Sequence, residues 1–473
     1  MTGTVRARYA LAVIGAGPAG LAAASVAATH GLDTVLLDEQ SAPGGQIYRA
    51  ITETPVRNEA VLGPDYWHGR SLAGDFARSG AHYVPGATVW SVARGGEIGL
   101  SVGGAAHLIR ADHVILATGA LERPMPIPGW TLPGVMTVGA AQILLKASGL
   151  VAERPLVLAG SGPLLWLFAS QHLAAGGRIT ALLDTTPRAN LWRALPHLPD
   201  FLASPYARKG LRLVAAVRRQ VPVFRNITAL RAVGEGRLQT VAYRRGGGRE
   251  QSFETDLLLL HQGVVPHLNL ALAAGCRPEW DEAQLCFRPI ADEWGATDVD
   301  GIAIAGDGAG ILGAEAAEAR GRLAAFDALG RLDHIDRAQR DRDAGSDRAA
   351  LARWTRGRRF LDRLYQPAPQ FRVPEGDTIV CRCEEVTARQ VREAVRLGVT
   401  GPNQLKAFLR CGMGPCQGRL CGLTVNAVIA GARGVSPAAV GHYRLRPPVK
   451  PITLGELAQI PKSAAARQAV ERG

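Results

Sequence analysis

Two segments of this chain each consist of an apolar strand, a glycine-rich turn, a helix and a second strand, and this repeated unit constrains the fold more than any other feature. The first segment, residues 9–40, contains the strands ALAVIG and TVLLD, the turn GAGPAG and an Ala-rich helix that Gly31 ends. The second segment, residues 154–184, reads RPLVLAGSGPLLWLFASQHLAAGGRITALLD. Strands joined through a helix lie parallel in one sheet. The chain is therefore expected to be an α/β protein.

The first turn has the glycine spacing that a bound dinucleotide requires. Gly15 allows the tight turn, Gly17 lets the backbone approach a pyrophosphate, and Gly20 lets the helix pack closely on the strand. The helix N-terminus offers free N–H groups to the phosphates, and Asp38 at the second strand's end can accept a hydrogen bond from a ribose hydroxyl. This pattern favours a Rossmann-like nucleotide-binding domain over a glycine-rich turn without a ligand.

The second turn departs from this pattern at one position. Gly160 and Gly162 are present and Asp184 ends the second strand, but Leu165 stands where the third glycine is expected. A leucine there disfavours close approach of the helix to the strand. A second Rossmann-like domain is still predicted, whereas its ligand stays open between NAD(P)H, another adenine nucleotide and none.

The cysteines are clustered near the C-terminus. Five of the seven lie between residues 381 and 421, in VCRCEEVT and RCGMGPCQGRLCG. An odd, clustered set argues against a secreted disulfide scaffold and for a reducing compartment, so a cytoplasmic protein is expected. Thiolates gathered in this way suit zinc or an Fe–S cluster, but Cys381 and Cys383 are spaced more tightly than the C-x2-4-C knuckle of structural zinc.

Charge and hydropathy argue against two other classes of protein. The net charge is +13, yet the arginines are scattered and are not interleaved with aromatic residues as in single-strand-binding proteins. Nucleic acid is therefore not an expected partner, although an acidic protein would suit the charge. The uncharged stretch of residues 9–28 is long enough to cross a bilayer, but its glycines and proline match the nucleotide turn, and no transmembrane segment is expected.

Four further stretches resemble the superfamily of flavoproteins with two dinucleotide-binding domains, that of glutathione and thioredoxin reductase. They are PGGQIYR (43–49), ADHVILATGA (111–120), GVVPH (263–267) and TDVDGIAIAGDGAG (297–310). The resemblance implies FAD on the first domain, with Asp307 bonded to the ribityl chain of the flavin. The FAD-site residues that it implies are Gly15, Gly17, Pro18, Ala19, Gly20, Asp38, Glu39, Gly45, Gln46, Ala117, Thr118, Gly119, Gly306 and Asp307.

After residue 325 the composition changes to a charged, mostly helical connector and a proline-rich linker, QPAPQFRVPEG. Short helices are then expected after Thr387, which can cap the first, and from Pro402. The cysteine segment resembles the [2Fe–2S] domain of the bacterioferritin-associated ferredoxin (BFD) type, in which C-x-C is followed, two short helices later, by a second cysteine pair. The resemblance implies that the ligands are Cys381, Cys383, Cys416 and Cys421. Cys411 is expected to be a small buried residue outside this set.

The order of parts resembles one family over nearly the whole chain, including the tail YRLRPPVKPITLGELAQI. This family is the α subunit of multi-subunit FAD-dependent amino-acid and imino-acid dehydrogenases, which include opine oxidases, D-hydroxyproline or proline dehydrogenases and the hydrogen cyanide synthase flavoprotein subunit. The resemblance implies an electron-transferring oxidoreductase subunit with a [2Fe–2S] cluster. Its implied partners are an FAD-containing β subunit, which oxidises the C–N bond, and a small ferredoxin-like γ subunit.

Two alternatives of a different class remain. A stand-alone NAD(P)H-dependent flavin reductase would pass electrons through the cluster, and Leu165 weighs against it. A nucleotide-binding scaffold without chemistry is the other, and the complete FAD motifs weigh against it. No general base stands out in the sequence, and the catalytic residues and the amino or imino acid stay open.

The predicted organisation has six parts. They are the first part of the FAD domain at residues 1–150, an inserted NAD-like dinucleotide domain at 151–262, the second part of the FAD domain at 263–330, the connector and linker at 331–376, the BFD-like domain at 377–435 and a tail at 436–473.

Overall fold

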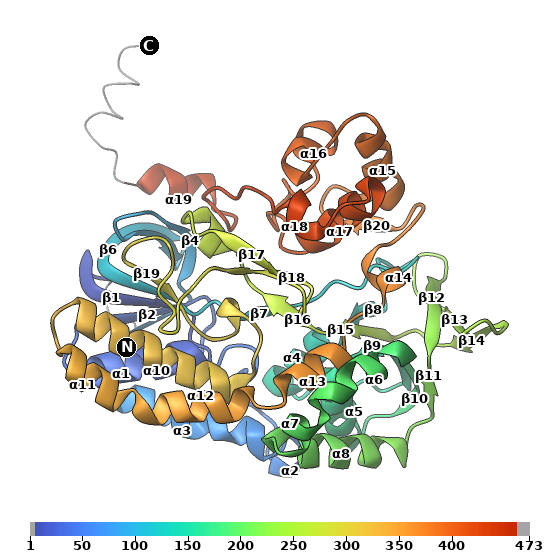
Figure 1. The fold of residues 1–473 in the computed structure, drawn as a ribbon, viewed down its shortest axis with the longest axis horizontal. Coiled ribbons are helices and arrows are strands. Elements are labelled where there is room, and N and C mark those ends of the chain that lie inside the picture. The colour runs from blue at the N-terminus through green and yellow to red at the C-terminus, as the bar shows by residue number, and fades with distance from the viewer. Residues whose placement is uncertain (1–4, 461–473) are drawn as a thin grey trace.

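The computed structural model describes residues 5–460 and contains two large α/β units and a smaller helical unit (Figure 1). The predicted tail, 436–473, is described as far as residue 460, and residues 461–473 lie outside the described part. Within residues 5–460, no helix combines the length and the apolar character needed to cross a membrane. The uncharged stretch at residues 9–28 forms most of one strand and most of one helix instead.

The first α/β unit contains a seven-stranded sheet in the order β3-β2-β1-β6-β5-β4, with β19 beside β6. Neighbours among β3, β2, β1, β6 and β19 pair in parallel, and β5 and β4 extend the sheet with antiparallel pairs. Leu11 and Val13 face the core that contains helices α1 and α10, whereas Ala12 and Ile14 face the opposite core. The elements are β1 (Arg8–Ile14), α1 (Pro18–Thr29), β2 (Thr34–Asp38), α2 (Glu59–Leu62), α3 (Pro64–Arg78), β3 (His82–Pro85), β4 (Thr88–Val92), β5 (Glu97–Val102), β6 (Ala105–Leu116), α9 (Asn269–Ala273), β17 (Pro278–Asp281), β18 (Cys286–Pro289), β19 (Ile302–Ile304), η2 (Gly306–Ala309) and α10 (Ala314–Arg331).

The second α/β unit is built on a five-stranded parallel sheet in the order β11-β10-β9-β15-β8. Leu165 is fully buried in the core beside this sheet. Strands β7 (Ala120–Glu122) and β16 (Val264–Pro266) pair where the chain enters and leaves the unit. Its other elements are β8 (Val135–Thr137), α4 (Val138–Ser148), β9 (Leu156–Ser161), α5 (Pro163–Ala174), β10 (Ile179–Asp184), α6 (Arg188–Ala194), η1 (Leu195–His197), α7 (Leu198–Leu202), α8 (Pro205–Arg218), β11 (Val223–Arg225), β12 (Ile227–Val233), β13 (Thr240–Arg245), β14 (Glu250–Glu254) and β15 (Leu258–Gln262).

The C-terminal third begins with short helices and ends in the cysteine-bearing unit, shown in orange and red in Figure 1. Thr387 caps α15 in a capping box with Gln390, and α16 begins at Pro402, as predicted. This unit has its own apolar core, to which Tyr443 and Leu445 of the tail contribute. The elements are α11 (Arg337–Asp343), α12 (Gly345–Thr355), α13 (Arg358–Leu364), α14 (Pro369–Arg372), β20 (Ile379–Cys381), β21 (Val386–Thr387), α15 (Ala388–Arg396), α16 (Pro402–Leu409), α17 (Gly422–Arg433), α18 (Pro437–Val440) and α19 (Leu454–Gln459).

The proline-rich segment before the cysteines is packed rather than extended through solvent. Phe371 is buried in a core of the second α/β unit, and its carbonyl accepts a hydrogen bond from Nε2 of Gln262 at 3.1 Å. Nε1 of Trp130 donates to the carbonyl of Ile379 at 2.8 Å. Nδ2 of Asn269, in α9, donates to the carbonyl of Gln417 at 2.9 Å. The hydrogen bond between Asn269 and Gln417 therefore fixes the cysteine-bearing unit against the first α/β unit, which contains the FAD motifs.

Candidate cofactor sites

The glycine turn at residues 15–20 meets the turn of the PGGQIYR stretch beside the ends of β1 and β2. Both turns are predicted to contact FAD. The N–H of Gly44 donates to the carbonyl of Ala16 at 2.8 Å, and a Cβ on Gly45 would lie 2.7 Å from the Cα of Gly17. A Cβ on Gly17 itself would lie 3.9 Å from the Cα of Gly45, an ordinary contact, with no closer atom among the described residues. The backbone at Gly17 is therefore accessible to a pyrophosphate.

Residues 117–119, which follow β6, pack against the same turn. A Cβ on Gly15, where φ is +106°, would lie 2.4 Å from the carbonyl oxygen of Ala117. A Cβ on Gly20 would lie 1.8 Å from the carbonyl oxygen of Gly15. Both glycines are required by close approach of the protein's own backbone. Pro18 is the first residue of α1, where its fixed φ suits the helix start.

The GVVPH stretch joins residues 117–119 through two hydrogen bonds. Oγ1 of Thr118 donates to the carbonyl of His267 at 3.2 Å, and the N–H of His267 donates to the carbonyl of Gly119 at 3.0 Å. The predicted motifs ATG and GVVPH are therefore neighbours, although they are far apart in the sequence.

The end of the TDVDGIAIAGDGAG stretch contacts helix α1. A Cβ on Gly306 would lie 2.7 Å from the Cβ of Ala19. Oδ1 of Asp307 accepts the N–H groups of Leu312 at 2.8 Å and Gly313 at 3.0 Å. These bonds orient the carboxylate, whose Oδ2 is the candidate acceptor for a ribityl hydroxyl.

Two acidic residues stand at the end of β2. The carboxylate of Asp38 is almost fully buried and accepts the N–H groups of Ala16 and Gln40, the latter at 2.7 Å. Burial raises the pKa of Asp38. Glu39 is more exposed and forms an ion pair with Lys450. Burial acts to raise the pKa of Glu39, but the ammonium of Lys450 holds this pKa below its usual value. Asp38 thus connects β2 to the glycine turn, and Lys450 of the tail holds the side chain of Glu39.

A buried lysine fixes the turn that contains Gln46. Nζ of Lys146, in α4, donates to the carbonyl of Ile47 at 2.8 Å and to that of Gln46 at 3.4 Å. It also donates to Oε1 of Gln142 at 3.0 Å, and Gln142 in turn donates to Oε1 of Gln171 in α5 at 2.8 Å. Burial lowers the pKa of Lys146 to about 7. A line of buried polar groups therefore joins the flavin turn to the second α/β unit.

The second glycine turn is occupied by protein on one side. A Cβ on Gly160 would lie 1.6 Å from the carbonyl oxygen of His261, and a Cβ on Gly162 would lie 3.1 Å from Nε2 of this histidine. Nδ1 of His261 is 2.5 Å from Oε1 of Glu122, and both side chains are largely buried. The turn is formed as predicted, and the ligand of this unit stays a prediction.

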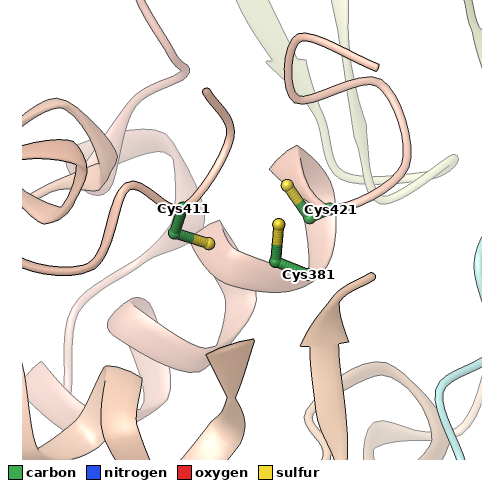
Figure 2. Close-up of side chains that lie close together, drawn as sticks. All are labelled: Cys381, Cys411 and Cys421. Atoms are coloured by element: carbon green, nitrogen blue, oxygen red, sulfur yellow. The ribbon is translucent and has the colours of Figure 1, made fainter. Parts of the chain in front are cut away.

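Five cysteines come together in the C-terminal unit. The Sγ atoms of Cys381, Cys411 and Cys421 lie within 4.8 Å of one another, and all three side chains are buried. Figure 2 shows these sulfur atoms pointing toward a common space. The side chains of Cys383 and Cys416 influence each other's pKa, and Cys421 also influences the pKa of Cys416, so these thiols are neighbours. The four predicted ligands therefore form two adjacent pairs, 381 with 421 and 383 with 416. Cys411 lies beside the first pair.

Hydrogen bonds among these thiols favour thiolates at two positions. Bonds from Cys411 and Cys421 lower the pKa of Cys381 to about 2. A bond from Cys421 lowers the pKa of Cys416 to about 5 although burial acts to raise it. The bond to Cys381 raises the pKa of Cys411 to about 12. The pKa values of the other two predicted ligands are raised, that of Cys383 mainly by burial and that of Cys421 mainly by its bond to Cys381. Thiolate is the form of cysteine that binds metal, and sulfur donors gathered in this way fit an iron–sulfur cluster.

Two contacts hold the cysteine segments together. Nε of Arg410 is 3.1 Å from Oε2 of Glu384, which joins the loop before Cys411 to the turn after Cys383. A Cβ on Gly414 would lie 2.3 Å from the Cβ of Cys383. Only a glycine at position 414 lets the two segments approach this closely.

The structure also places residues at these sites that the motifs did not identify. Lys146 lies at the flavin turn, Gly414 at Cys383, and Tyr443 and Lys450 reach the sites from the tail. Tyr443 and Lys450 fall within the tail stretch that resembles the family, which was their only signal in the sequence.

Comparisons with known proteins agree with both predicted cofactors. Residues 9–340 match the family model described as pyridine nucleotide-disulphide oxidoreductase, and residues 379–431 match the BFD-like [2Fe-2S] binding domain. The chain is 49% identical to the A subunit of opine oxidase from Agrobacterium tumefaciens (strain Ach5), covering 98% of this chain and 94% of that protein. It is 33% identical to the HcnB subunit of hydrogen cyanide synthase from Pseudomonas aeruginosa, covering 93% and 96%. Among solved structures, the L-proline dehydrogenase from P. horikoshii has the same fold, with a TM-score of 0.68 at 20% identity, covering 95% of this chain and 79% of that one.

FAD and a [2Fe–2S] cluster are therefore the cofactors of this chain. The accessible backbone at Gly17 suits the first, and the two cysteine pairs suit the second. The predicted fold class is confirmed, with two Rossmann-like units and a helical BFD-like unit.

Proposed function

This chain belongs to the pyridine nucleotide-disulphide oxidoreductase family and is related to the A subunits of opine oxidases. We propose that it is the electron-transferring subunit of a multi-subunit dehydrogenase. The complex oxidises the C–N bond of an amino or imino acid of the opine, proline, hydroxyproline or glycine class. A partner β subunit with its own FAD holds the substrate, and a small ferredoxin-like γ subunit completes the complex.

One observation carries this proposal: the cysteine loop is docked on the unit that bears the FAD motifs. Asn269 of α9 holds the carbonyl of Gln417, the residue after the predicted ligand Cys416, at 2.9 Å. When bound, a flavin accepts electrons in pairs and an iron–sulfur cluster passes them singly. The chain's own residues fix the two sites against each other, which suits electron transfer between the flavin and the cluster.

Names of relatives support the complex. The proteins at 49% and 33% identity are both called subunits, of opine oxidase and of hydrogen cyanide synthase.

None of the seven cysteines, all of which lie in the described part of the chain, forms a disulfide, and this supports a reducing compartment such as the cytoplasm. Within the proposal, the domain boundaries are those predicted from the sequence except that β8 and α4 belong to the second α/β unit, because β8 pairs with β15. The FAD-site residues are those predicted, and Cys381, Cys383, Cys416 and Cys421 are the ligands.

The direct test is purification of the tagged chain from its native host. We expect a flavoprotein partner to co-purify, the complex to contain more flavin than this chain alone, and dye reduction with an opine or a related substrate. The isolated chain should bind FAD and iron but reduce no dye with these substrates. Robust turnover by the isolated chain would show that the substrate site is not on a partner.

A second experiment separates the proposal from a stand-alone NAD(P)H-dependent reductase. With Leu165 in the third glycine position, NADH or NADPH should bleach the flavin slowly or not at all in stopped-flow mixing. Fast, saturable bleaching at low coenzyme concentration would favour the reductase.

The ligand set has its own test. Alanine at any of the four predicted ligand cysteines should remove the visible absorbance of the cluster and its reduced-state EPR signal while FAD stays bound, because a [2Fe–2S] cluster needs four protein ligands. If one of these four variants keeps its iron, the substituted cysteine is not a ligand.

A further inference from the structure

Tyr443, a residue of the tail, is enclosed by the cysteine loop. Cβ atoms on Gly412, Gly418 and Gly422 would lie 2.6, 2.8 and 3.3 Å from atoms of the Tyr443 ring. The ring is buried in the same core as Cys381, Cys411 and Cys421. Three glycines therefore make room for one aromatic ring, which closes the space beside the cysteines.

A cation on helix α16 contacts the face of this ring. Nζ of Lys406, in α16, lies 4.9 Å from the centroid of the Tyr443 ring and donates to the carbonyl of Arg444 at 3.0 Å. A cation at this distance is attracted to the ring face. The position of the Tyr443 hydroxyl is therefore fixed by packing and by this contact together.

The hydroxyl points at the fifth cysteine. Oη of Tyr443 donates to Sγ of Cys411 at 3.5 Å. Cys411 is fully buried, and its sulfur lies within 4.8 Å of those of Cys381 and Cys421. Because the sulfur of Cys411 accepts from Tyr443, its single S–H is free to point at one of these two neighbours. A donor that itself accepts a hydrogen bond is polarised and donates more strongly.

We propose that Tyr443 and Cys411 are positioning residues that form a hydrogen-bond relay to the sulfur ligands of the [2Fe–2S] cluster and make its reduction potential more positive. The proposal rests on the proposed ligand set, in which Cys381 and Cys421 bind iron and Cys411 does not. Reduction adds negative charge to the cluster and its sulfur ligands, and hydrogen-bond donors to sulfur stabilise that charge. The relay also explains why a fifth thiol is buried among four ligands.

The test uses the full chain with its cluster, in three variants: Tyr443→Phe, Cys411→Ala and Cys411→Ser. Iron and acid-labile sulfide are counted first, and the midpoint potential is then measured by reductive titration followed by EPR. We expect all three to keep the wild-type iron content. Tyr443→Phe and Cys411→Ala should shift the midpoint potential to more negative values, and Cys411→Ser, which retains a donor, should lie closer to the wild type.

Val440→Ala is the matched control, because Val440 packs in the same core without a polar group. It should lower the thermal stability and leave the potential unchanged. Unshifted potentials in Tyr443→Phe and Cys411→Ala, or an equal shift in Val440→Ala, would overturn the relay. Loss of iron from Cys411→Ala would overturn it in another way, by making Cys411 a ligand. That outcome leaves the proposed subunit function standing, since this function depends on co-purification and turnover.

Discussion

Lys450 and Glu39 form an ion pair although they are 411 positions apart in the chain. Glu39 follows β2, where the ribose of FAD is expected, and Lys450 lies seven residues after Tyr443. Between these two tail residues, Val449 is buried in a core of the first α/β unit and its N–H donates to the carbonyl of Trp90 at 2.9 Å. One short segment therefore contacts both cofactor sites.

The first prediction concerns this ion pair. Lys450→Ala frees the carboxylate of Glu39, which should weaken FAD binding only modestly, because a partly exposed pair contributes at most about 1 kcal/mol. The dissociation constant of FAD, measured by titrating the apoprotein and following flavin fluorescence, should rise by up to about fivefold. The difference from the wild type should shrink at high salt, which screens exposed charges.

Lys209→Ala is the control for this variant. It removes an ion pair with Asp65 whose two side chains are about half exposed, and it should leave the affinity for FAD unchanged. Equal affinities in wild type and Lys450→Ala would show that the tail does not act on the FAD site.

The second prediction separates a cofactor clash from a folding defect. At Gly17 the backbone is extended, with φ −77° and ψ −176°, and a Cβ has room. Gly17→Val should therefore fold like the wild type and lose its yellow colour on desalting, because the side chain takes the space of the pyrophosphate. Gly20→Ala would place its Cβ 1.8 Å from the carbonyl oxygen of Gly15, so it should lower the thermal midpoint or prevent soluble expression. Retention of FAD by folded Gly17→Val would move the pyrophosphate elsewhere.

The sequence predicted the parts of the fold that depend on local pattern. The turns at Gly15 and Gly160, the cap at Thr387 and the helix start at Pro402 all follow from residues within a few positions of one another. Leu165 departs from the glycine pattern, but only the structure shows that the second core accommodates this leucine. Long-range packing decided that point, and no local signal encodes it.

The cofactor sites were predictable only as motifs, because their supporting residues come from distant segments. The role of Tyr443 depends on three glycines in another part of the unit, and the role of Gly414 depends on Cys383 in the preceding cysteine segment.

The composition contained one further signal, because only five of the 54 basic residues are lysines. Three of these, Lys146, Lys406 and Lys450, lie beside the cofactor sites. At these three positions the side chain supplies a compact ammonium rather than the planar guanidinium of an arginine, whereas Lys209 forms a half-exposed ion pair with Asp65.

The third prediction follows from the burial of Lys146. Its pKa is lowered from 10.5 to about 7 in the folded chain, so below about pH 7 both the folded and the unfolded chain carry the proton. Between these two pKa values the unfolded chain binds a proton that the folded chain lacks. The contribution of Lys146 to the free energy of unfolding therefore rises with pH, by up to about 1.4 kcal/mol per pH unit. Urea unfolding followed by circular dichroism should show this rise in the wild type and its loss in Lys146→Met, whereas the exposed Lys209→Met should keep it. Parallel pH profiles for wild type and Lys146→Met would contradict the assignment.

The last prediction tests whether the approach of the two cysteine segments is needed for the cluster. In Gly414→Ala the new Cβ would lie 2.3 Å from the Cβ of Cys383 and 3.3 Å from its sulfur, so one segment must move and carry a predicted ligand away. Iron and sulfide per chain should fall to near zero while FAD stays bound, because the flavin turns lie in another unit. Gly431→Ala in α17 is the matched control: its Cβ would meet the Cγ1 of Val373 at 3.6 Å, an ordinary contact, and its iron content should equal that of the wild type. If Gly414→Ala kept its full iron content and an unchanged EPR signal, Cys383 would not be held in place by this contact, and its place among the ligands would lose its structural support.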